Sequence, residues 1–413
     1  MPRRIALVVL TLAALIVAAC GQSTQTASSN TLVLGAIYPL TGPQGPGGRE
    51  ELAGVQAALQ VAESSGALHR QVQLRVIDAV TPGAASAAVD RLVNQDHVPA
   101  ILGTYGSTLS AAASTRAEQL KTIYWETGAV ADPITAQRKY VFRTVATGSS
   151  LGREAVTFTH DVLIPKSGLK SPRVVVVQVD DVYGHSVGGG EADLARQLGI
   201  DVVDVITYNP NAFDPETLAG RIASDRADFL WDVSYLNDGV AIWQAIVSLK
   251  VPLLAAVGTS SAFCMPDFGR LLGRDAIGVF AADKPDASIS PAALSPAGRD
   301  LSARARAAYA RFNHTAMSIP AVAGFVGGWT LFNNVLADIS GTITPDAIRT
   351  VALGVDVPVG DSINGGGVRF GPDGSLAEGQ NTRSAAVVGQ WQGVQNMQIV
   401  YPAAYATSKP LLR

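Results

Sequence analysis

Strand-like and helix-like patterns alternate along this chain from Leu32 to about Tyr401, and this alternation leaves few folds open. Apolar runs or two-residue alternation, which are typical of strands, occupy residues 32–38, 71–78, 100–103, 122–126 and 140–143. Between them, Ala, Leu and Val recur at helical spacing in residues 49–65, 83–95 and 107–120. This regular exchange predicts βαβ units, in which helices cover both faces of a parallel-rich sheet.

A second series of the same kind begins near Ser149. Its predicted strands are residues 174–177, 201–208, 229–233, 252–257 and 276–281, and its predicted helices are residues 151–163, 191–198, 217–225 and 239–249. We interpret Gly188–Gly190 as a turn or a helix interruption. Three further helices are predicted at 297–312, 322–339 and 345–352, followed by strand-like segments at 385–391 and 396–401. Two series predict an α/β chain with two lobes.

The strand-to-helix loops are where we expect a ligand. In open parallel sheets, ligands bind beyond the carboxyl ends of the strands, and two facing lobes enclose a cleft there. The loops concerned are residues 40–48, 103–108, 126–132, 180–185, 232–238 and 258–263.

Composition excludes several kinds of site and partner. Of the 413 residues, 47% are apolar and 16% are charged, so the chain can bury a large core. The formal net charge is −3 and no basic run is present, which disfavours a nucleic-acid partner. The five His residues lack metal-ligand spacing, so we expect no metal and no cofactor. The two Cys residues are Cys20 and Cys264, and we expect Cys264 to be a small buried side chain.

The first twenty residues have the pattern of an export signal. Arg3 and Arg4 precede an apolar run at residues 5–17, which is short for a membrane-spanning helix. Val17-Ala18-Ala19-Cys20 is similar to a lipobox, in which the Cys becomes lipid-modified after cleavage; an uncleaved anchor is the alternative. Residues 21–30 are polar and nearly uncharged, as in a flexible tether. We therefore expect a folded body held by lipid at Cys20 to the extracytoplasmic face of the cell membrane.

Two loops carry candidate groups for a small anion. Gly103-Thr104-Tyr105-Gly106-Ser107-Thr108 opens a helix, so Ser107 either caps that helix or binds a carboxylate at its positive end. The small residues after Glu126, which include Gly128 and Ala129, can present backbone N–H groups from a second strand end. Tyr183, after the strand at 174–177, either covers a ligand or packs at a sheet edge.

These motifs, taken in order, resemble the branched-chain amino-acid (Leu/Ile/Val) binding proteins, the extracytoplasmic solute receptors of ABC importers. The chain opens with a strand, Pro39-Leu40-Thr41-Gly42-Pro43 and a Gly-bearing loop into a long Ala-rich helix, as they do. Gly103-x-x-Gly106-Ser107 is similar to the family's loop that ends in a ligand-binding Ser, and Asp180-x-x-Tyr183-Gly184 to its second-lobe strand end. The resemblance covers about residues 32–401 and implies a two-lobed periplasmic-binding-protein fold of type I.

The resemblance also implies roles for particular residues. Ser107 and the backbone of Gly128 and Ala129 would hold a ligand carboxylate. Tyr183, Tyr235 and Phe325 would line the pocket, with Phe325 standing where some relatives have Tyr.

This sequence also departs from the family's pattern. Amino-acid binders place a Glu for the ligand ammonium where this chain has Ser260, and many place a Thr where it has Val130. Either Glu126 or Asp181 compensates for the missing Glu, or the ligand has no α-ammonium group.

The expected function follows from the resemblance. We expect a monomeric receptor that closes by a hinge on an amino-acid-like, carboxylate or amide ligand and delivers it to the permease and ATPase subunits of an ABC importer. The alternative is a sensory receptor for a signalling partner, because the same fold serves both. An enzyme is not expected: Gly148-x-Ser150-x-Gly152 matches a nucleophile elbow only by its letters.

The resemblance also places the hinge and the lobe boundaries. The expected division is a signal at 1–20, a tether at 21–30, a first lobe of 31–147 plus 284–358, and a second lobe of 148–283 plus 359–405. The expected crossings lie near 145–149, 281–286 and 357–364.

Overall fold

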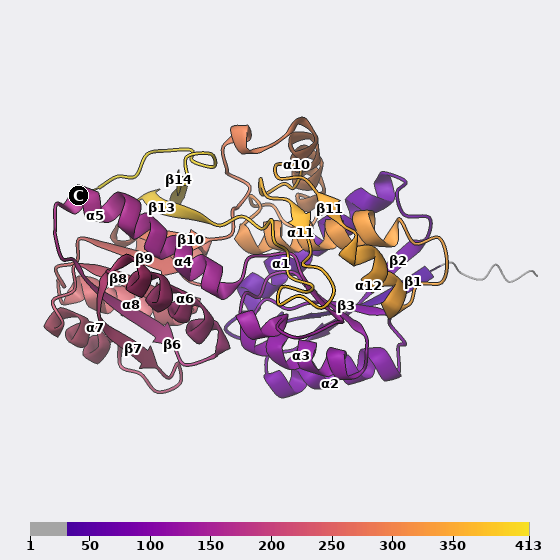
Figure 1. Ribbon diagram of the computed structural model, residues 1–413, viewed down its shortest axis with the longest axis horizontal. Coiled ribbons are helices and arrows are strands. Elements are labelled where there is room, and N and C mark those ends of the chain that lie inside the picture. The colour runs from indigo at the N-terminus through magenta and orange to yellow at the C-terminus, as the bar shows by residue number, and fades with distance from the viewer. Residues whose placement is uncertain (1–30, 413) are drawn as a thin grey trace, which may run out of the picture.

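The computed structural model describes residues 31–412 and places them in two lobes, each built on a sheet that helices cover (Figure 1). The expected signal, tether and Cys20 lie outside the described residues. The first sheet runs β2 (Gln71–Asp78), β1 (Thr31–Tyr38), β3 (Ala100–Gly103), β4 (Ile123–Glu126), β5 (Val141–Arg143), and all its pairs are parallel.

The second sheet is mixed. Its order is β14 (Asn396–Tyr401), β13 (Val387–Gly393), β10 (Phe280–Asp283), β9 (Ala255–Thr259), β8 (Phe229–Val233), β6 (Arg173–Val179), β7 (Asp201–Tyr208). Only the pairs that involve β13 are antiparallel. A short ribbon pairs β11 (Asp356–Val357) with β12 (Val368–Arg369). The predicted α/β class with two parallel-rich lobes is confirmed.

Helices cover both sheets. The first lobe carries α1 (Gly45–Ser64), α2 (Pro82–Asn94), α3 (Ser107–Gln119), α10 (Pro296–Tyr309), α11 (Ile319–Leu331) and α12 (Pro345–Leu353). The second carries α4 (Gly148–Phe158), α5 (Ile164–Ser167), α6 (Val182–Leu198), α7 (Pro215–Ser224), α8 (Leu236–Ser248) and α9 (Pro266–Leu272). The π-helical segments Thr159–Leu163 and Phe332–Leu336 extend α4 and α11, and single 3₁₀ turns lie at Asp132–Ile134, Gly273–Ala276 and Pro291–Ala293.

Two helix starts differ from the predicted ones. Helix α1 begins at Gly45, with Pro46 in its first turn. Backbone N–H groups in the first turn have no partner within the helix, so proline, which has no N–H group, is tolerated there. Helix α6 begins at Val182, so the interpretation of Gly188–Gly190 as a turn is wrong. The glycines lie inside α6 where it packs on α4: a Cβ atom on Gly190 would stand 2.3 Å from the carbonyl oxygen of Ser149. Close helix packing therefore outweighs the low helix propensity of glycine.

Helix α11 is a core helix of the first lobe. The segment Ile319–Leu336 is the one described helix long and apolar enough to span a membrane, but 83% of it is buried inside the protein. It packs on α1, where a Cβ atom on Gly54 would stand 2.0 Å from the carbonyl oxygen of Ala321. Its apolar character is thus explained by burial on all sides.

The segment that follows α12 belongs with the first sheet. Phe370 contacts the rings of Trp125 and Phe142, with centroids 5.4 and 5.1 Å apart, and Asn381 Nδ2 donates to the carbonyl oxygen of Thr144 at 2.8 Å. The expected division assigns residues 359–383 to the second lobe, whereas these contacts attach them to the first. We therefore propose that the third crossing lies near 384–386, and we retain the other two near 145–149 and 281–286.

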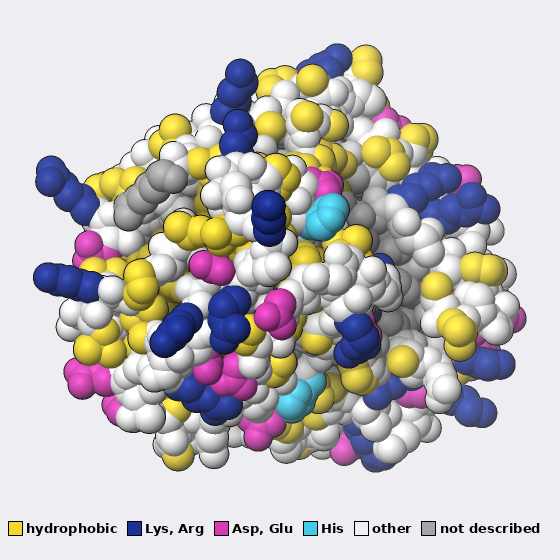
Figure 2. Space-filling model, turned by 60° about the vertical axis from the view of Figure 1, so that its left-hand side comes forward, with side chains coloured by type: hydrophobic (Ala, Val, Ile, Leu, Met, Phe, Trp, Pro, Cys, Tyr) yellow, Lys and Arg dark blue, Asp and Glu magenta, His cyan; other side chains and the backbone are white. Residues whose placement is uncertain are grey.

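Charged side chains are mixed on the visible surface. On the face shown in Figure 2, Lys and Arg side chains lie among Asp and Glu side chains rather than in one patch. That face presents no continuous area of one charge sign.

Candidate ligand-binding cleft

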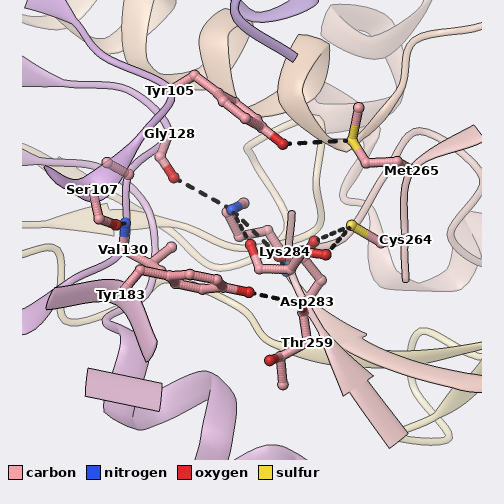
Figure 3. A network of polar contacts seen from close by, with 12 residues as sticks. Tyr105, Ser107, Gly128, Val130, Tyr183, Thr259, Cys264, Met265, Asp283 and Lys284 are labelled. Atoms are coloured by element: carbon pink, nitrogen blue, oxygen red, sulfur yellow. Dashed lines mark hydrogen bonds and ion pairs between the residues drawn. The ribbon is translucent and has the colours of Figure 1, made fainter. Parts of the chain in front are cut away.

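Loops from both lobes meet across a cleft. The hydroxyl group of Thr108, on α3, donates to Asp181 Oδ2, at the start of α6, over 3.0 Å. The hydroxyl group of Tyr105 lies 3.7 Å from the sulfur of Met265 (Figure 3). Thr108, Asp181 and Tyr105 come from strand-end loops in which the sequence predicts a ligand site, and Met265 lies two residues beyond the predicted loop at 258–263.

The cleft contains an outer and an inner cavity. The outer cavity, of about 530 Å³, is lined by residues that include Gln44 and Thr108 of the first lobe and Asp181, Tyr235 and Asp238 of the second. The inner cavity, of about 10 Å³, is lined by residues that include Glu51, Tyr105, Gly128, Ser260, Cys264, Asp283 and Lys284. A small molecule fits the volume of the outer cavity, whereas the inner one has room for about one water molecule.

The first-lobe groups expected to hold a carboxylate are hydrogen-bonded within their own lobe. The N–H groups of Gly128 and Ala129 donate to Glu126 Oε1, over 2.7 and 2.6 Å. Ser107 is the first residue of α3, and its hydroxyl oxygen accepts from the N–H groups of Val130 and Ala131 over 3.3 and 3.2 Å. In this structure the loop after β4 therefore satisfies its donors with protein oxygens.

The two second-lobe tyrosines lie together at the cleft. Tyr183 is 1% exposed, its ring centroid is 5.2 Å from that of Tyr235, and its hydroxyl group donates to the carbonyl oxygen of Thr259 over 2.8 Å. The Tyr235 hydroxyl donates to Asp181 Oδ2 over 2.9 Å. Burial raises the pKa of both phenols well above the ordinary value, so they remain neutral donors. Of the two, Tyr235 lines the outer cavity.

Ser260 meets a buried cation that sequence reasoning missed. Lys284 is 7% exposed, and its ammonium group donates to Ser260 Oγ and to the carbonyl oxygen of Gly128, each over 3.3 Å (Figure 3). The same nitrogen lies 3.3 Å from Asp283 Oδ1. A signal was present, since Asp283-Lys284-Pro285 follows a predicted strand at a predicted crossing, where charged residues are close to both lobes.

Two buried glutamates in the first lobe also shape the cleft. Glu51, on α1, is fully buried; its Oε1 accepts from the hydroxyl group of Thr127 over 2.5 Å, and its Oε2 has no hydrogen-bond partner among the described residues. Burial, and then the charge of Glu126, raise the pKa of Glu51 to about 8. Burial likewise raises the pKa of Glu126 to about 7, although hydrogen bonds from Ser110 and two backbone N–H groups act to lower that pKa. Near neutral pH, Glu51 is therefore mainly uncharged.

The two acids considered for the missing Glu have different positions. Glu126 is held inside the first lobe by Ser110, Gly128 and Ala129. Asp181 lines the outer cavity, but its Oδ1 already accepts from the N–H groups of Tyr183 and Gly184, each over 2.9 Å.

Three other residues lie away from the cleft centre or serve the fold. Phe325 is fully buried in the first-lobe core, stacked on Trp329 at 6.2 Å, and borders neither cavity. Ser150 is exposed on the first turn of α4, with its hydroxyl 2.7 Å from that of Thr147. Cys264 is buried as expected, and its sulfur lies 2.6 Å from Asp283 Oδ2.

Comparison with known proteins decides the family. A family model described as periplasmic binding protein matches residues 31–394. The chain belongs to the periplasmic binding protein family. This confirms the resemblance noted in the sequence.

Relatives of this binding protein cover nearly its whole length. A Leu/Ile/Val-binding protein homolog of Brucella abortus is 29% identical over 389 residues, which are 93% of this chain and 94% of the relative. The branched-chain amino-acid binding protein LivJ of Streptococcus pneumoniae, solved with isoleucine, has a TM-score of 0.72 at 18% identity, over 90% of this chain and 100% of that one. A solute-binding protein of R. palustris, solved with benzoate, has a TM-score of 0.74 at 16% identity, over 92% and 98%.

These findings fix the class of this periplasmic binding protein. It is an extracytoplasmic solute-binding receptor, and its family and structural neighbours are not enzymes. The letters around Ser150 therefore do not mark a nucleophile.

Proposed function

We propose that this binding protein is a lipid-anchored receptor that captures a small amino-acid-like, carboxylate or amide ligand by hinge closure and delivers it to an ABC importer. Its partners are the permease and ATPase subunits of that importer and, through lipid at Cys20, the extracytoplasmic face of the cell membrane. The protein acts as a monomer. Nucleic acid is not a partner.

The observation that carries the proposal is the outer cavity. Its walls come from both lobes, and Thr108 and Asp181 meet across it. A ligand that contacts both walls stabilises the closed arrangement over an open one, because only the closed arrangement makes both sets of contacts.

Of the proposed ligand contacts, Tyr235 borders the outer cavity, and Ser260 and Gly128 border the inner one. Ser107, Ala129 and Tyr183 become ligand contacts only if the loops around them exchange their internal hydrogen bonds for bonds to the ligand. Phe325 acts through the core that supports α11.

A thermal-shift screen of the purified mature protein tests the proposal. Branched-chain and aromatic amino acids, the corresponding acids and the corresponding amides are the probes. A true ligand at 100 times its dissociation constant adds about 2.7 kcal/mol to the free energy of unfolding. Tyr235→Ala should remove most of that shift, whereas Tyr140→Ala, which breaks a similar Tyr–Asp hydrogen bond outside the cleft, should keep it. Binding that survives Tyr235→Ala unchanged would place the site elsewhere.

A further inference from the structure

Lys284 lies between the lobes, at the end of β10. Its ammonium group donates to two acceptors, the carbonyl oxygen of Gly128 in the first lobe and Ser260 Oγ in the second, and it forms an ion pair with Asp283 Oδ1. Figure 3 shows its side chain pointing toward Gly128 across the cleft. Burying an ammonium group is unfavourable unless it is paired and hydrogen-bonded, and here both conditions are met.

The charges around Lys284 balance without a ligand. Asp283 is the paired carboxylate: its Oδ1 also accepts from the backbone N–H of Lys284 over 2.7 Å, and its Oδ2 lies against the thiol of Cys264. Glu51 is the second carboxyl group on the wall of the inner cavity, and burial favours its neutral form. One buried cation therefore faces one buried anion.

A charged ligand end would disturb this balance. A ligand ammonium group would need the acceptors that Lys284 already uses, and it would stand beside a like charge. A ligand carboxylate would have to take Lys284 from Asp283, or take from Glu126 the N–H groups of Gly128 and Ala129, and in either case it would leave a protein carboxyl group without its partner. The polar atom left over on the wall of the inner cavity is Glu51 Oε2, which can exchange one hydrogen bond with a neutral group.

We propose that Lys284 determines the specificity of the cleft: its ammonium group occupies the position between the lobes that a ligand ammonium group would take. The receptor consequently binds ligands whose buried end is uncharged, such as a primary amide, and rejects α-amino acids. This inference rests on the proposed function, because it concerns the ligand of the same cleft. The apolar body of the ligand would extend toward the outer cavity through the small space lined by Gln44, Tyr105, Tyr235 and Met265, which shares lining residues with both cavities.

Two sets of matched compounds test the inference by titration calorimetry. The first set is leucine, leucinamide, 4-methylpentanoate and 4-methylpentanamide, and the second is the corresponding set with a phenyl body. Within each set the body is constant and only the charge of the end changes. The wild-type protein should bind the neutral amide at least about tenfold more tightly than the other three members.

Variants of the ion pair separate a charge effect from a general defect. Lys284→Met leaves Asp283 without its cation. The affinities for leucinamide and leucine should therefore rise at least about tenfold relative to the affinity for the neutral amide. The double variant Lys284→Met with Asp283→Asn restores charge balance and should remove that gain. If the single variant does not fold, the double variant still tests the inference, because it should bind the neutral amide. Lys170→Met, at an exposed position, should behave as the wild type.

The outcomes distinguish this inference from the proposed function. Wild-type binding of leucine or 4-methylpentanoate as tight as that of the amide overturns the inference and supports the receptor. An unchanged preference in Lys284→Met also overturns it. If no member of either set binds the wild type or the variants, the neutral-end ligand is wrong, and the broader thermal-shift screen alone decides the proposed function.

Discussion

Thr108 and Asp181 join the two lobes directly, since the Thr108 hydroxyl donates to Asp181 Oδ2 over 3.0 Å. Tyr235 donates to the same oxygen from the second lobe, so Asp181 is the point where the outer wall of the cleft closes. In the proposed closure, a ligand in the outer cavity would lie beside this shared carboxylate.

We predict that Thr108→Val weakens ligand binding by up to about tenfold, because a hydrogen bond to a charged acceptor in the closed form is lost. The shape of the side chain is nearly retained, so packing should change little. The matched control is Thr115→Val on the same helix, whose hydroxyl donates to the carbonyl oxygen of Ala111 and accepts from Arg138, both within the first lobe. Equal effects of the two substitutions in calorimetric titrations would contradict a role for the contact in closure.

Because α4 packs on one side of α6, we predict opposite effects on stability when two neighbouring glycines of α6 are replaced by alanine. Gly190→Ala places a Cβ atom 2.3 Å from the carbonyl oxygen of Ser149 and should destabilise the protein by about 1–3 kcal/mol. Gly189→Ala meets nothing within 4 Å and should stabilise it by about 0.5–1 kcal/mol, because alanine favours the helix. Melting temperatures of both variants check the pair, and a stable Gly190→Ala protein would show that the helices do not pack this closely.

The buried carboxyl group of Glu51 predicts a loss of stability with rising pH. Its pKa is raised to about 8 in the folded protein, so the folded state holds a proton that the unfolded state has released. The free energy of unfolding should therefore fall from about pH 4.5 up to about pH 8, at no more than about 1.4 kcal/mol per pH unit for this group. Denaturant unfolding of the wild type and of Glu51→Gln, which keeps an oxygen for Thr127, measures this slope.

Glu126 contributes in the same direction, up to its raised pKa of about 7, so Glu51→Gln should reduce the slope without abolishing it. Glu63→Gln, at an exposed position on the same helix, is the control and should leave the pH profile unchanged. A slope that is identical in Glu51→Gln and in the wild type would show that Glu51 is ionised in the folded protein.

The lipid anchor is tested at Cys20, which lies outside the described residues. We predict that Cys20→Ala abolishes lipid attachment and moves the protein from the membrane to the soluble extracytoplasmic fraction, because Val17-Ala18-Ala19-Cys20, which resembles a lipobox, then lacks the Cys that would carry the lipid. Cell fractionation and mass spectrometry of the N-terminus measure both effects. A variant that stays in the membrane with an unchanged N-terminus refutes the anchor.

The order of strands and helices follows from the sequence because hydrophobic periodicity is a local property. The loops after β3, β6 and β8 were placed in this way, and they bring Ser107, Tyr183 and Tyr235 toward one cleft. Periodicity does not report packing, however. It therefore missed that Gly190 lies inside α6 against α4. The third crossing that the resemblance implies, near 357–364, stays a prediction, and we propose a later crossing because Phe370 packs in the first-lobe core.

The polar centre of the cleft was harder to predict for a related reason. Glu51, Gly128 and Lys284 come together from three distant parts of the chain, and no local pattern marks them as neighbours. The resemblance supplied donors for a ligand carboxylate at Gly128 and Ala129, but it did not reveal that Glu126 accepts from both. Pairings of this kind depend on side-chain geometry at the strand ends, which appears only once the strands are in place.

Small-angle scattering with and without ligand tests hinge closure on a small molecule most directly. The sample is the mature protein, and the ligand is the compound that stabilises it most in the thermal-shift screen. We predict that saturating ligand reduces the radius of gyration, and that Tyr235→Ala at the same ligand concentration shows no such reduction. A wild-type protein that binds the compound with no change in its scattering curve would contradict capture by closure of the two lobes.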